Sequence, residues 1–274
     1  MTSLTRPSPP LRLHALRVNW HLIGQLTRRD VSAKYRGSLF GLAWSFITPL
    51  LMLSVYVFVF SFVFKARWGN RANENQLDFA LLIFIGLLIH GFLSECLMRA
   101  PMLLVQHANY VKKVVFPLEV LPVSVMLGAL TQFSIGSAIM LGFVAFAHGG
   151  LPPTVLFYPL VIAPFVLLAL GITWVVSSLG VFIRDLAQAT GLFSTILMFL
   201  SPVFYPVTAL PERWRPLFQL NPLTFIIEEA RAVVFWGHAP DWAGLALYFV
   251  VATLVCGLGL AWFQRTRHAF ADVL

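Results

Sequence analysis

The chain consists mostly of long apolar segments separated by short polar ones, a pattern typical of a polytopic membrane protein. A helix needs about 20 apolar residues to cross a bilayer. Six segments come close to that length or exceed it, and the fifth runs into Ser201-Pro202 and Pro206, where we expect a tilted or broken helix. We therefore predict an all-α integral membrane protein whose transmembrane domain covers residues 39–264. The expected spans are 39–64, 79–98, 120–147, 155–183, 187–205 and 243–263.

Residues 1–38 precede the first span and contain an amphipathic pattern from position 11 to about 27. An aromatic and aliphatic face opposite a basic and polar one, just before a span, favours a helix in the headgroup layer over an ordinary soluble helix. The apolar side carries Leu16, Trp20, Ile23 and Leu26, and the polar side Arg17, His21, Gln25 and Arg28.

The connection 206–241 is too long for a turn and contains apolar residues at helical spacing. Asn221-Pro222 is a typical helix start, with Asn as the N-cap and Pro in the first turn. Glu228 and Arg231 are three positions apart and share a face. We expect two short re-entrant helices on the outer side, one of them with an apolar face of Leu223, Ile226, Ile227, Ala230 and Val234.

The distribution of basic residues predicts the orientation. If the N-terminus is cytoplasmic, 13 of the 19 Lys and Arg residues lie in inner segments and 6 in outer ones. This split follows the positive-inside rule. Both termini, including the tail 265–274, are then cytoplasmic.

Composition excludes most other classes of protein. The chain is 59% hydrophobic and only 11% charged, whereas soluble domains are about 25% charged. The net charge of +8 is explained by the inner loops, and no basic stripe indicates nucleic-acid binding. Cys96 and Cys256 both lie in apolar segments, so we expect neither a disulfide nor a metal site.

Little in the sequence suggests catalysis. The chain has no GxxxxGK[ST] phosphate loop, so it binds no nucleotide by a known motif. His90 and Glu95 are the two ionisable residues within one span. Five positions place them about 140° apart on a helix, which argues against one shared site. We expect hydrogen bonding between helices, or Glu95 extending towards the inner surface beside Arg99.

Aromatic residues recur every three or four positions in the first and fifth spans. Such stripes usually pack in a core or against lipid, but they also suit a sugar pathway, because sugar C–H faces stack on rings. The stripes are Met52, Tyr56, Phe60 and Phe64, and Phe193, Leu197, Leu200 and Phe204.

Five ordered motifs together resemble the permease subunit of ABC-2 type polysaccharide exporters. The resemblance is strongest to O-antigen exporters, with teichoic acid exporters nearby and capsule exporters less similar. Leu118 departs from the pattern, since many relatives have a basic residue there. The motifs are RDVSAKYRGS with LFGLAW and TPL (29–50), NYVKKVVFP (109–117), FIRDL (182–186), SPVFYP (201–206), and NPL (221–223) with Arg231.

The resemblance implies a homodimer bound to two copies of a separate ATPase, exporting an undecaprenyl-pyrophosphate-linked glycan across the bacterial inner membrane. Residues 99–113 would contain the cytoplasmic coupling helix, which we expect to begin at Pro101. In this interpretation Gln106, His107, Asn109 and Lys112 contact the ATPase, and Arg184 and Asp185 brace the neighbouring inner turn.

Three further site hypotheses follow. Arg28, Arg29, Tyr35 and Arg36 would form an entrance for the lipid pyrophosphate, since Arg suits phosphate. Met52, Tyr56, Phe60, Phe193, Phe204 and Tyr205 would line a channel between two copies, closed on the outside by 206–234. Glu228 and Arg231 would pair within one helix or reach across that gate.

The alternatives to a polysaccharide exporter are an ABC-2 drug or lipid exporter, a polytopic enzyme acting on a lipid-linked substrate, and an assembly subunit.

Overall fold

The computed structural model describes residues 19–34, 36–63, 76–111 and 116–274, and the regular elements in these ranges are helices. The α-helices are α2 (Trp20–Lys34), α3 (Trp44–Tyr56), α4 (Gln76–Gln106), α5 (Ala108–Val111), α6 (Val120–His148), α7 (Tyr158–Phe182), α8 (Leu186–Leu200), α9 (Arg215–Gln219), α10 (Pro222–Val234), α11 (Trp242–Thr266) and α12 (Phe270–Val273). Short 3₁₀ turns cover Gly41–Ala43, Pro153–Phe157, Val207–Ala209, Glu212–Trp214 and Arg267–Ala269, and Val57–Val63 is π-helical.

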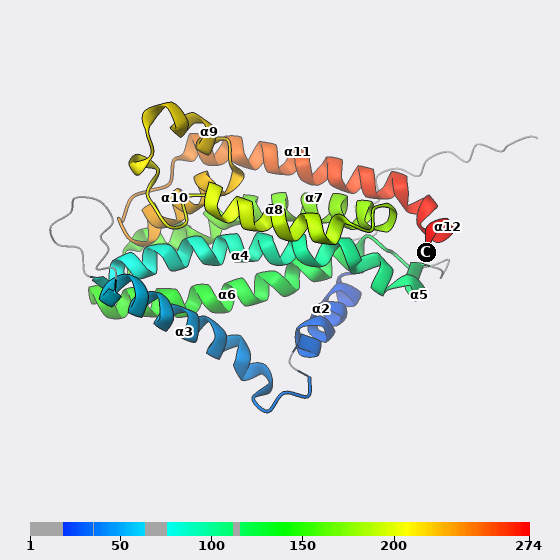
Figure 1. The fold of residues 1–274 in the computed structure, drawn as a ribbon, viewed down its shortest axis with the longest axis horizontal. Helices are drawn as coiled ribbons and strands as arrows, with labels where there is room; N and C mark the ends of the chain where they lie inside the picture. Colours follow the sequence, from blue (N-terminus) through cyan, green and yellow to red (C-terminus); the bar gives the residue numbers. More distant parts are fainter. Residues whose placement is uncertain (1–18, 35, 64–75, 112–115) are drawn as a thin grey trace, which may run out of the picture.

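Four long helices, α4, α6, α7 and α11, form the body of the molecule (Figure 1). Helix α7 packs against α4, α6 and α11, and α4 also contacts α8. Within the described ranges, four helical stretches are long and apolar enough to cross a membrane: Leu77–Gln106, Val120–His148, Pro153–Phe182 and Trp242–Val273. They coincide with the second, third, fourth and sixth expected spans.

The first and fifth expected spans are shorter helices in the structure. Apolar helix covers Trp44–Phe60 and Leu186–Leu200, both below the length of the other four. Helix α3 begins only at Trp44, after the turn Gly41–Ala43, and residue 64 lies outside the described residues. Helix α8 ends at Leu200, not at Tyr205, because Pro202 lacks the N–H that would continue it. The expected break at Ser201-Pro202 is confirmed.

Helices α7 and α11 pack closely at two glycine residues, Gly171 and Gly259. A Cβ on Gly171 would lie 2.7 Å from the Cα of Cys256, and one on Gly259 would lie 2.3 Å from the Gly171 carbonyl oxygen. Small residues allow two helix backbones to approach closely, as is common in membrane bundles. The sequence of the two helices therefore fixes their contact at these glycines.

The expected amphipathic helix is α2, but it continues past Thr27 to Lys34, and residues before 19 lie outside the described ranges. Helix α2 packs against α6 and forms a V with α3 beside the long helices (Figure 1). Ile23 is buried, whereas Trp20 is 68% exposed. The apolar face is thus only partly covered by protein.

The expectation that a new helix begins at Pro101 is wrong. Pro101 lies inside α4, which continues to Gln106 and is followed by the four-residue helix α5. A Cβ on Gly180 of α7 would lie 2.1 Å from the Pro101 carbonyl oxygen, so the two backbones are in contact there. Pro101 thus marks a close approach between α4 and α7.

The connection between α8 and α11 contains the predicted helix start. The Asn221 side chain accepts a hydrogen bond from the Leu223 N–H at 2.9 Å, and Pro222 occupies the first turn of α10. The expected apolar face of α10 is buried. The companion helix α9 has only five residues.

Candidate functional site

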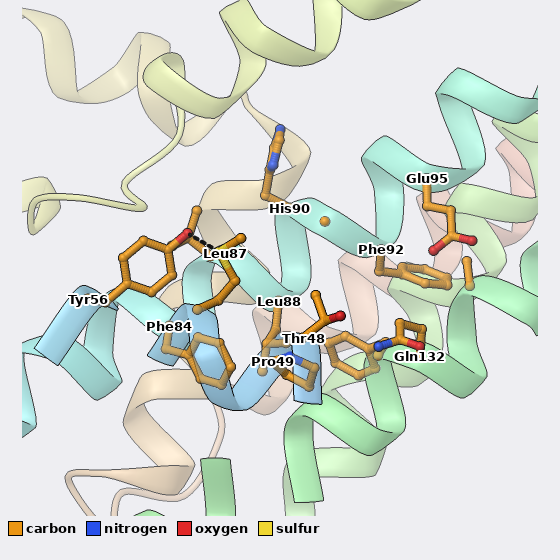
Figure 2. Close-up of a pocket in the computed structure, with 14 residues that line it drawn as sticks. Thr48, Pro49, Tyr56, Phe84, Leu87, Leu88, His90, Phe92, Glu95 and Gln132 are labelled. Atoms are coloured by element: carbon orange, nitrogen blue, oxygen red, sulfur yellow. Dashed lines mark hydrogen bonds between the residues drawn. The ribbon is translucent and has the colours of Figure 1, made fainter. Parts of the chain in front are cut away.

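A cavity of about 370 Å³ lies between α3, α4 and α6 (Figure 2). Its walls are mostly apolar, with a small number of polar side chains, as in most small-molecule sites. Two residues expected to line a channel, Met52 and Tyr56, are among its walls. The lining is Thr48, Pro49, Met52 and Tyr56 from α3, Phe84, Leu87, Leu88, His90, Gly91, Phe92 and Glu95 from α4, and Ala129, Gln132 and Phe133 from α6.

Rings from two helices form one end of this cavity. The Tyr56 ring lies 6.4 Å from Phe84 and 6.4 Å from Phe60, and its hydroxyl is 4.0 Å from the Met52 sulfur. Tyr56 and Phe84 lie together in Figure 2, with Glu95 and Gln132 towards the opposite end. The Phe92 ring lies beside Glu95 in the same view, so the end with the polar side chains also carries aromatic surface.

His90 connects α4 to α8. Its Nε2 is 3.0 Å from the carbonyl oxygen of Ser194, and the Ser194 hydroxyl donates to the Ser94 hydroxyl at 2.7 Å. His90 is 7% exposed. The expected interhelical hydrogen bonding of His90 is confirmed, and it holds α8 against the same helix that lines the cavity.

Glu95 belongs to a group of four charges shared by α2 and α4. Arg99 lies 3.4 Å from Glu95 and also forms an ion pair with Asp30, while Lys34 pairs with Glu95. Each helix contributes one acid and one base four positions apart, so the two faces are complementary. The position of Glu95 beside Arg99 was predicted. The partners Asp30 and Lys34 were not, although their spacing on one helix was a usable signal.

The other expected channel residues do not line this cavity. Phe60 packs on Phe79 at 5.6 Å, and Phe204 packs on Phe199 at 6.0 Å. The Tyr205 hydroxyl donates to the Phe199 carbonyl oxygen at 2.7 Å. Phe193 is 54% exposed on α8. A single copy therefore does not bring all six residues to one surface.

Helices α3 and α8 carry large apolar side chains that the other described residues leave exposed. Contiguous exposed apolar surface of this kind is typical of a membrane or protein contact. The exposed residues include Phe46, Leu50, Leu51 and Val55 on α3, Phe58 in the π-helical segment that follows it, and Leu192, Ile196, Phe199 and Leu200 on α8.

The expected entrance residues lie on α2 and just after it. Arg28 and Arg36 are exposed, and Arg29 donates a long hydrogen bond of 3.4 Å to the Tyr110 hydroxyl. Arg28 faces a cleft between α2 and α6. Tyr35 lies outside the described residues.

The residues expected to meet an ATPase gather at one end of the bundle, which also holds α12 and the C-terminus (Figure 1). Gln106 and Asn109 are exposed around α5. His107 stacks on Tyr110 with ring centroids 5.8 Å apart. Arg184 and Asp185 are exposed in the turn between α7 and α8, and Lys112 lies outside the described residues.

Arg231 is fully buried rather than directed into an opening. It pairs with Glu228 at 2.9 Å, which is the pairing within one helix that was expected as one option. Sequence reasoning missed its other partners, the carbonyl oxygens of Leu82, Pro202 and Val203. These bonds join α10 to α4 and to the break after α8.

Together these features are those of a multi-pass α-helical membrane protein with a cavity between its helices and, within the residues that the structure describes, no group of three metal-binding side chains. The chain belongs to the ABC-2 type transporter family, whose model matches residues 21–235. It is accordingly a transporter subunit and not an enzyme.

Its relatives have more specific names. The chain is 28% identical to the O-antigen export system permease protein RfbA of Myxococcus xanthus, covering 92% of this chain and 94% of the relative. It is 24% identical to a protein of the same name from Klebsiella pneumoniae, over 92% of this chain and 95% of the relative.

Proposed function

We propose that this chain is the membrane permease of an O-antigen exporter in the bacterial inner membrane. The observation that carries the proposal is the full-length likeness to two permeases of that name within the family. The same names favour O-antigen over teichoic acid or capsular polysaccharide as cargo.

In this proposal α3 and α8 are the first and fifth of six spans. Both are apolar and both are shorter than the other four. A short span is accommodated by local thinning of the bilayer or by association with another protein surface. The positive-inside rule favours a cytoplasmic location for both termini, and with them for α5 and α12.

Two copies of the chain would enclose the glycan pathway between them. A two-fold interface can open along its axis, whereas one subunit would have to separate its helices. The uncovered faces of α3 and α8 supply the surface for that interface. Met52 and Tyr56 then line the pathway from the cavity, and Phe60, Phe193, Phe204 and Tyr205 would do so from the helix ends and α8.

Energy would come from two copies of a separate ATPase that bind ATP and Mg²⁺. The docking surface we propose is the exposed end formed by Gln106, His107 and Asn109, braced by Arg184 and Asp185. A crosslinker placed at position 107 should capture the ATPase in the assembled complex. Capture from a residue at the opposite end, such as Arg213, is the negative control.

The lipid pyrophosphate would enter near α2. Arg29 is engaged by Tyr110 and Arg28 faces α6, so Arg36, exposed just beyond α2, is the residue to test. Arg36→Ala is expected to lower binding of the lipid-linked glycan without loss of protein. Unchanged binding and export in this variant would count against the entrance.

We propose that the Glu228–Arg231 ion pair on α10 has a structural role in the outer gate. Glu228 is partly exposed while Arg231 is fully buried, so the pair anchors the segment 206–234 and does not itself open. Movement at the gate would then involve the segment before α10, where α9 and the short turns carry fewer buried side chains.

The proposed function is tested by reconstitution. Purified permease and its ATPase are placed in vesicles with lipid-linked O-antigen on the ATPase side, and ATP-dependent appearance of glycan in the lumen is measured. Transfer of lipid-linked teichoic acid precursor is the comparison. No ATP-dependent transfer of O-antigen by an assembled, ATP-hydrolysing complex would refute the proposal.

A further inference from the structure

The second large hollow in the described residues lies between α2 and α6 and has a volume of about 610 Å³. It is separate from the α3, α4 and α6 cavity and none of the proposed export machinery except Arg28 touches it. Its walls are mostly apolar and include Ile23 and Val31 of α2 and Leu127 and Leu130 of α6. The volume is within the range of about 300–1,000 Å³ common for bound small molecules.

The hydroxyl groups on the α6 side of this cleft already donate hydrogen bonds to backbone carbonyl oxygens of α6. Thr131 donates to the Leu127 carbonyl oxygen at 2.8 Å, and Ser134 donates to the Leu130 carbonyl oxygen at 2.7 Å. Hydroxyls bonded to their own helix present mainly their carbon atoms to the cleft. The α6 wall is therefore suited to hydrocarbon.

The α2 side offers one cation and one unsatisfied hydroxyl. Arg28 is exposed and borders the cleft. The Thr27 hydroxyl, also in the lining, is buried and has no hydrogen-bond partner among the described residues. A buried polar atom without a partner is costly, but this oxygen is covered by protein, so the group that faces the cleft is the Arg28 guanidinium.

The carboxylate of Asp30 lies near this cleft, but it does not repel an anionic ligand there. Asp30 follows on the same helix, and its Oδ2 would lie 2.9 Å from a Cβ on Gly128 of α6. Its other oxygen is paired with Arg99 of α4, whose Nη1 would lie 3.8 Å from the same Cβ, so the charge of Asp30 is neutralised beside Gly128. The net charge presented to the cleft is that of Arg28.

We propose that this cleft is a binding site for an anionic membrane phospholipid. One acyl chain lies between α2 and α6, and the phosphate lies at the rim, where Arg28 donates to its oxygens. A single cation matches the single charge of a phosphodiester better than the larger charge of a pyrophosphate. The inference rests on the proposed function only for the placement of α2 at the cytoplasmic face of the membrane.

Such a lipid would hold α2 in place. Helix α2 contacts the rest of the molecule mainly through α6 and the charged group with α4. Filling the cleft completes the contact with α6 and covers the remaining apolar face of α2. The lipid thus acts as a structural component rather than as cargo.

Gly24 allows the site to be blocked with little disturbance, because a Cβ there would meet nothing within 4 Å. Gly24→Phe places a ring in the cleft. The matched control is Gly257→Phe on the exposed face of α11, where a Cβ also meets nothing within 4 Å. Arg28→Gln removes the cation, and Arg265→Gln removes an exposed cation at the same end of the molecule.

The readout is the phospholipid retained per protomer in the purified permease–ATPase complex, measured by native mass spectrometry after delipidation in detergent. We expect wild type and both controls to keep one phosphatidylglycerol per protomer and Gly24→Phe to lose it. Arg28→Gln should bind added phosphatidylglycerol about tenfold more weakly, the loss typical of one charge-assisted hydrogen bond. Retention of lipid by Gly24→Phe at the wild-type level would overturn the site.

A second measurement uses the wild-type chain and does not depend on the folding of a variant. A phosphatidylglycerol with a photoreactive group on its acyl chain should label peptides from residues 20–32 and 127–134. Labelling confined to other helices would overturn the proposal, as would recovery of a polyprenyl phosphate instead of phospholipid. Because no transport is measured, these results are independent of whether the complex exports O-antigen.

Discussion

Arg231 donates two hydrogen bonds to the carbonyl oxygen of Leu82, from Nη2 at 2.9 Å and from Nε at 3.1 Å. The two residues are 149 positions apart, and the contact joins α10 to the first third of α4. Gly86 makes room for it, since a Cβ there would lie 3.2 Å from Nη2. A single buried guanidinium therefore connects α10, α4 and the end of α8.

Arg231→Met should destabilise the protein strongly. The change removes five hydrogen bonds and leaves carbonyl oxygens of Leu82, Pro202 and Val203 without that donor. Breaking a buried charge network by removing one partner costs about 3–5 kcal/mol. We expect a clear fall in the melting temperature of the purified complex and a lower yield.

Glu228→Gln is the matched comparison. The Glu228 side chain is 31% exposed, and Arg231 keeps its carbonyl partners in this variant, so the loss should be much smaller. Equal melting temperatures for Arg231→Met and wild type would show that the buried network does not stabilise the fold.

Gly259→Ala should disrupt the contact between α7 and α11, whereas Gly257→Ala should not. The new methyl group at 259 would meet the Gly171 carbonyl oxygen at 2.3 Å, so the two backbones must separate. At 257 it meets nothing within 4 Å and adds helix propensity worth up to about 1 kcal/mol. Thermal unfolding of the two variants should therefore shift in opposite directions, and parallel shifts would contradict the packing.

The charged group between α2 and α4 should show a modest coupling energy. Lys34 and Glu95 are paired, with 34% and 19% of their side chains exposed, and exposed ion pairs contribute at most about 1 kcal/mol. A double-mutant cycle with Lys34→Met and Glu95→Gln should give a coupling below about 1 kcal/mol that decreases in high salt. A coupling of zero at low salt would mean that the pair does not hold α2.

Hydropathy predicted the four long helices and the helix start at Asn221, because these depend on local composition. Hydropathy misplaced the start of the first span and the end of the fifth. The apolar sequence extends past both points, but the helix starts only after the turn at Gly41 and stops before Pro202. Pro101 was taken for a helix start, but α7 presents Gly180 to it and the helix continues. The close approach compensates for the proline, and no pattern within α4 reveals that.

The candidate sites likewise divide into contacts that local spacing predicted and contacts between distant segments that it did not. Met52 and Tyr56 could be placed together because they are one helical turn apart. The carbonyl partners of Arg231 come from two distant segments, at Leu82 and at Pro202 and Val203, so periodicity did not indicate that the residue is buried. For Glu95 the local partner Arg99 was predicted, whereas Lys34 required knowledge of how α2 crosses α4.

Glu229 should make stability depend on pH. Partial burial raises the pKa of its carboxyl group, and the charges of Asp241 and Glu228 raise it further, against a hydrogen bond from the Asp241 N–H. The folded protein thus binds the proton more tightly than the unfolded chain does, so stability contributed by this group increases as the pH falls from neutral towards about 4.3. Glu229→Gln should be at least as stable as wild type at neutral pH, and the difference in melting temperature should shrink on acidification. A constant difference would contradict the raised pKa.

Gly91→Leu should block the cavity between α3, α4 and α6. Gly91 is in the cavity wall, and a Cβ there would meet nothing within 4 Å, so the leucine side chain has room to enter without displacing the helices. If the cavity lines the glycan pathway, export in vesicles should fall by about tenfold, equivalent to about 1.4 kcal/mol added to the barrier.

Gly142→Leu is the control, because Gly142 is equally open but lies on α6 away from the cavity. Both substitutions bring the same gain in helix propensity, so a difference between them reports on the cavity alone. Normal export by an assembled Gly91→Leu complex would show that the glycan does not pass along this surface, and the pathway would then have to run along the exposed face of α8.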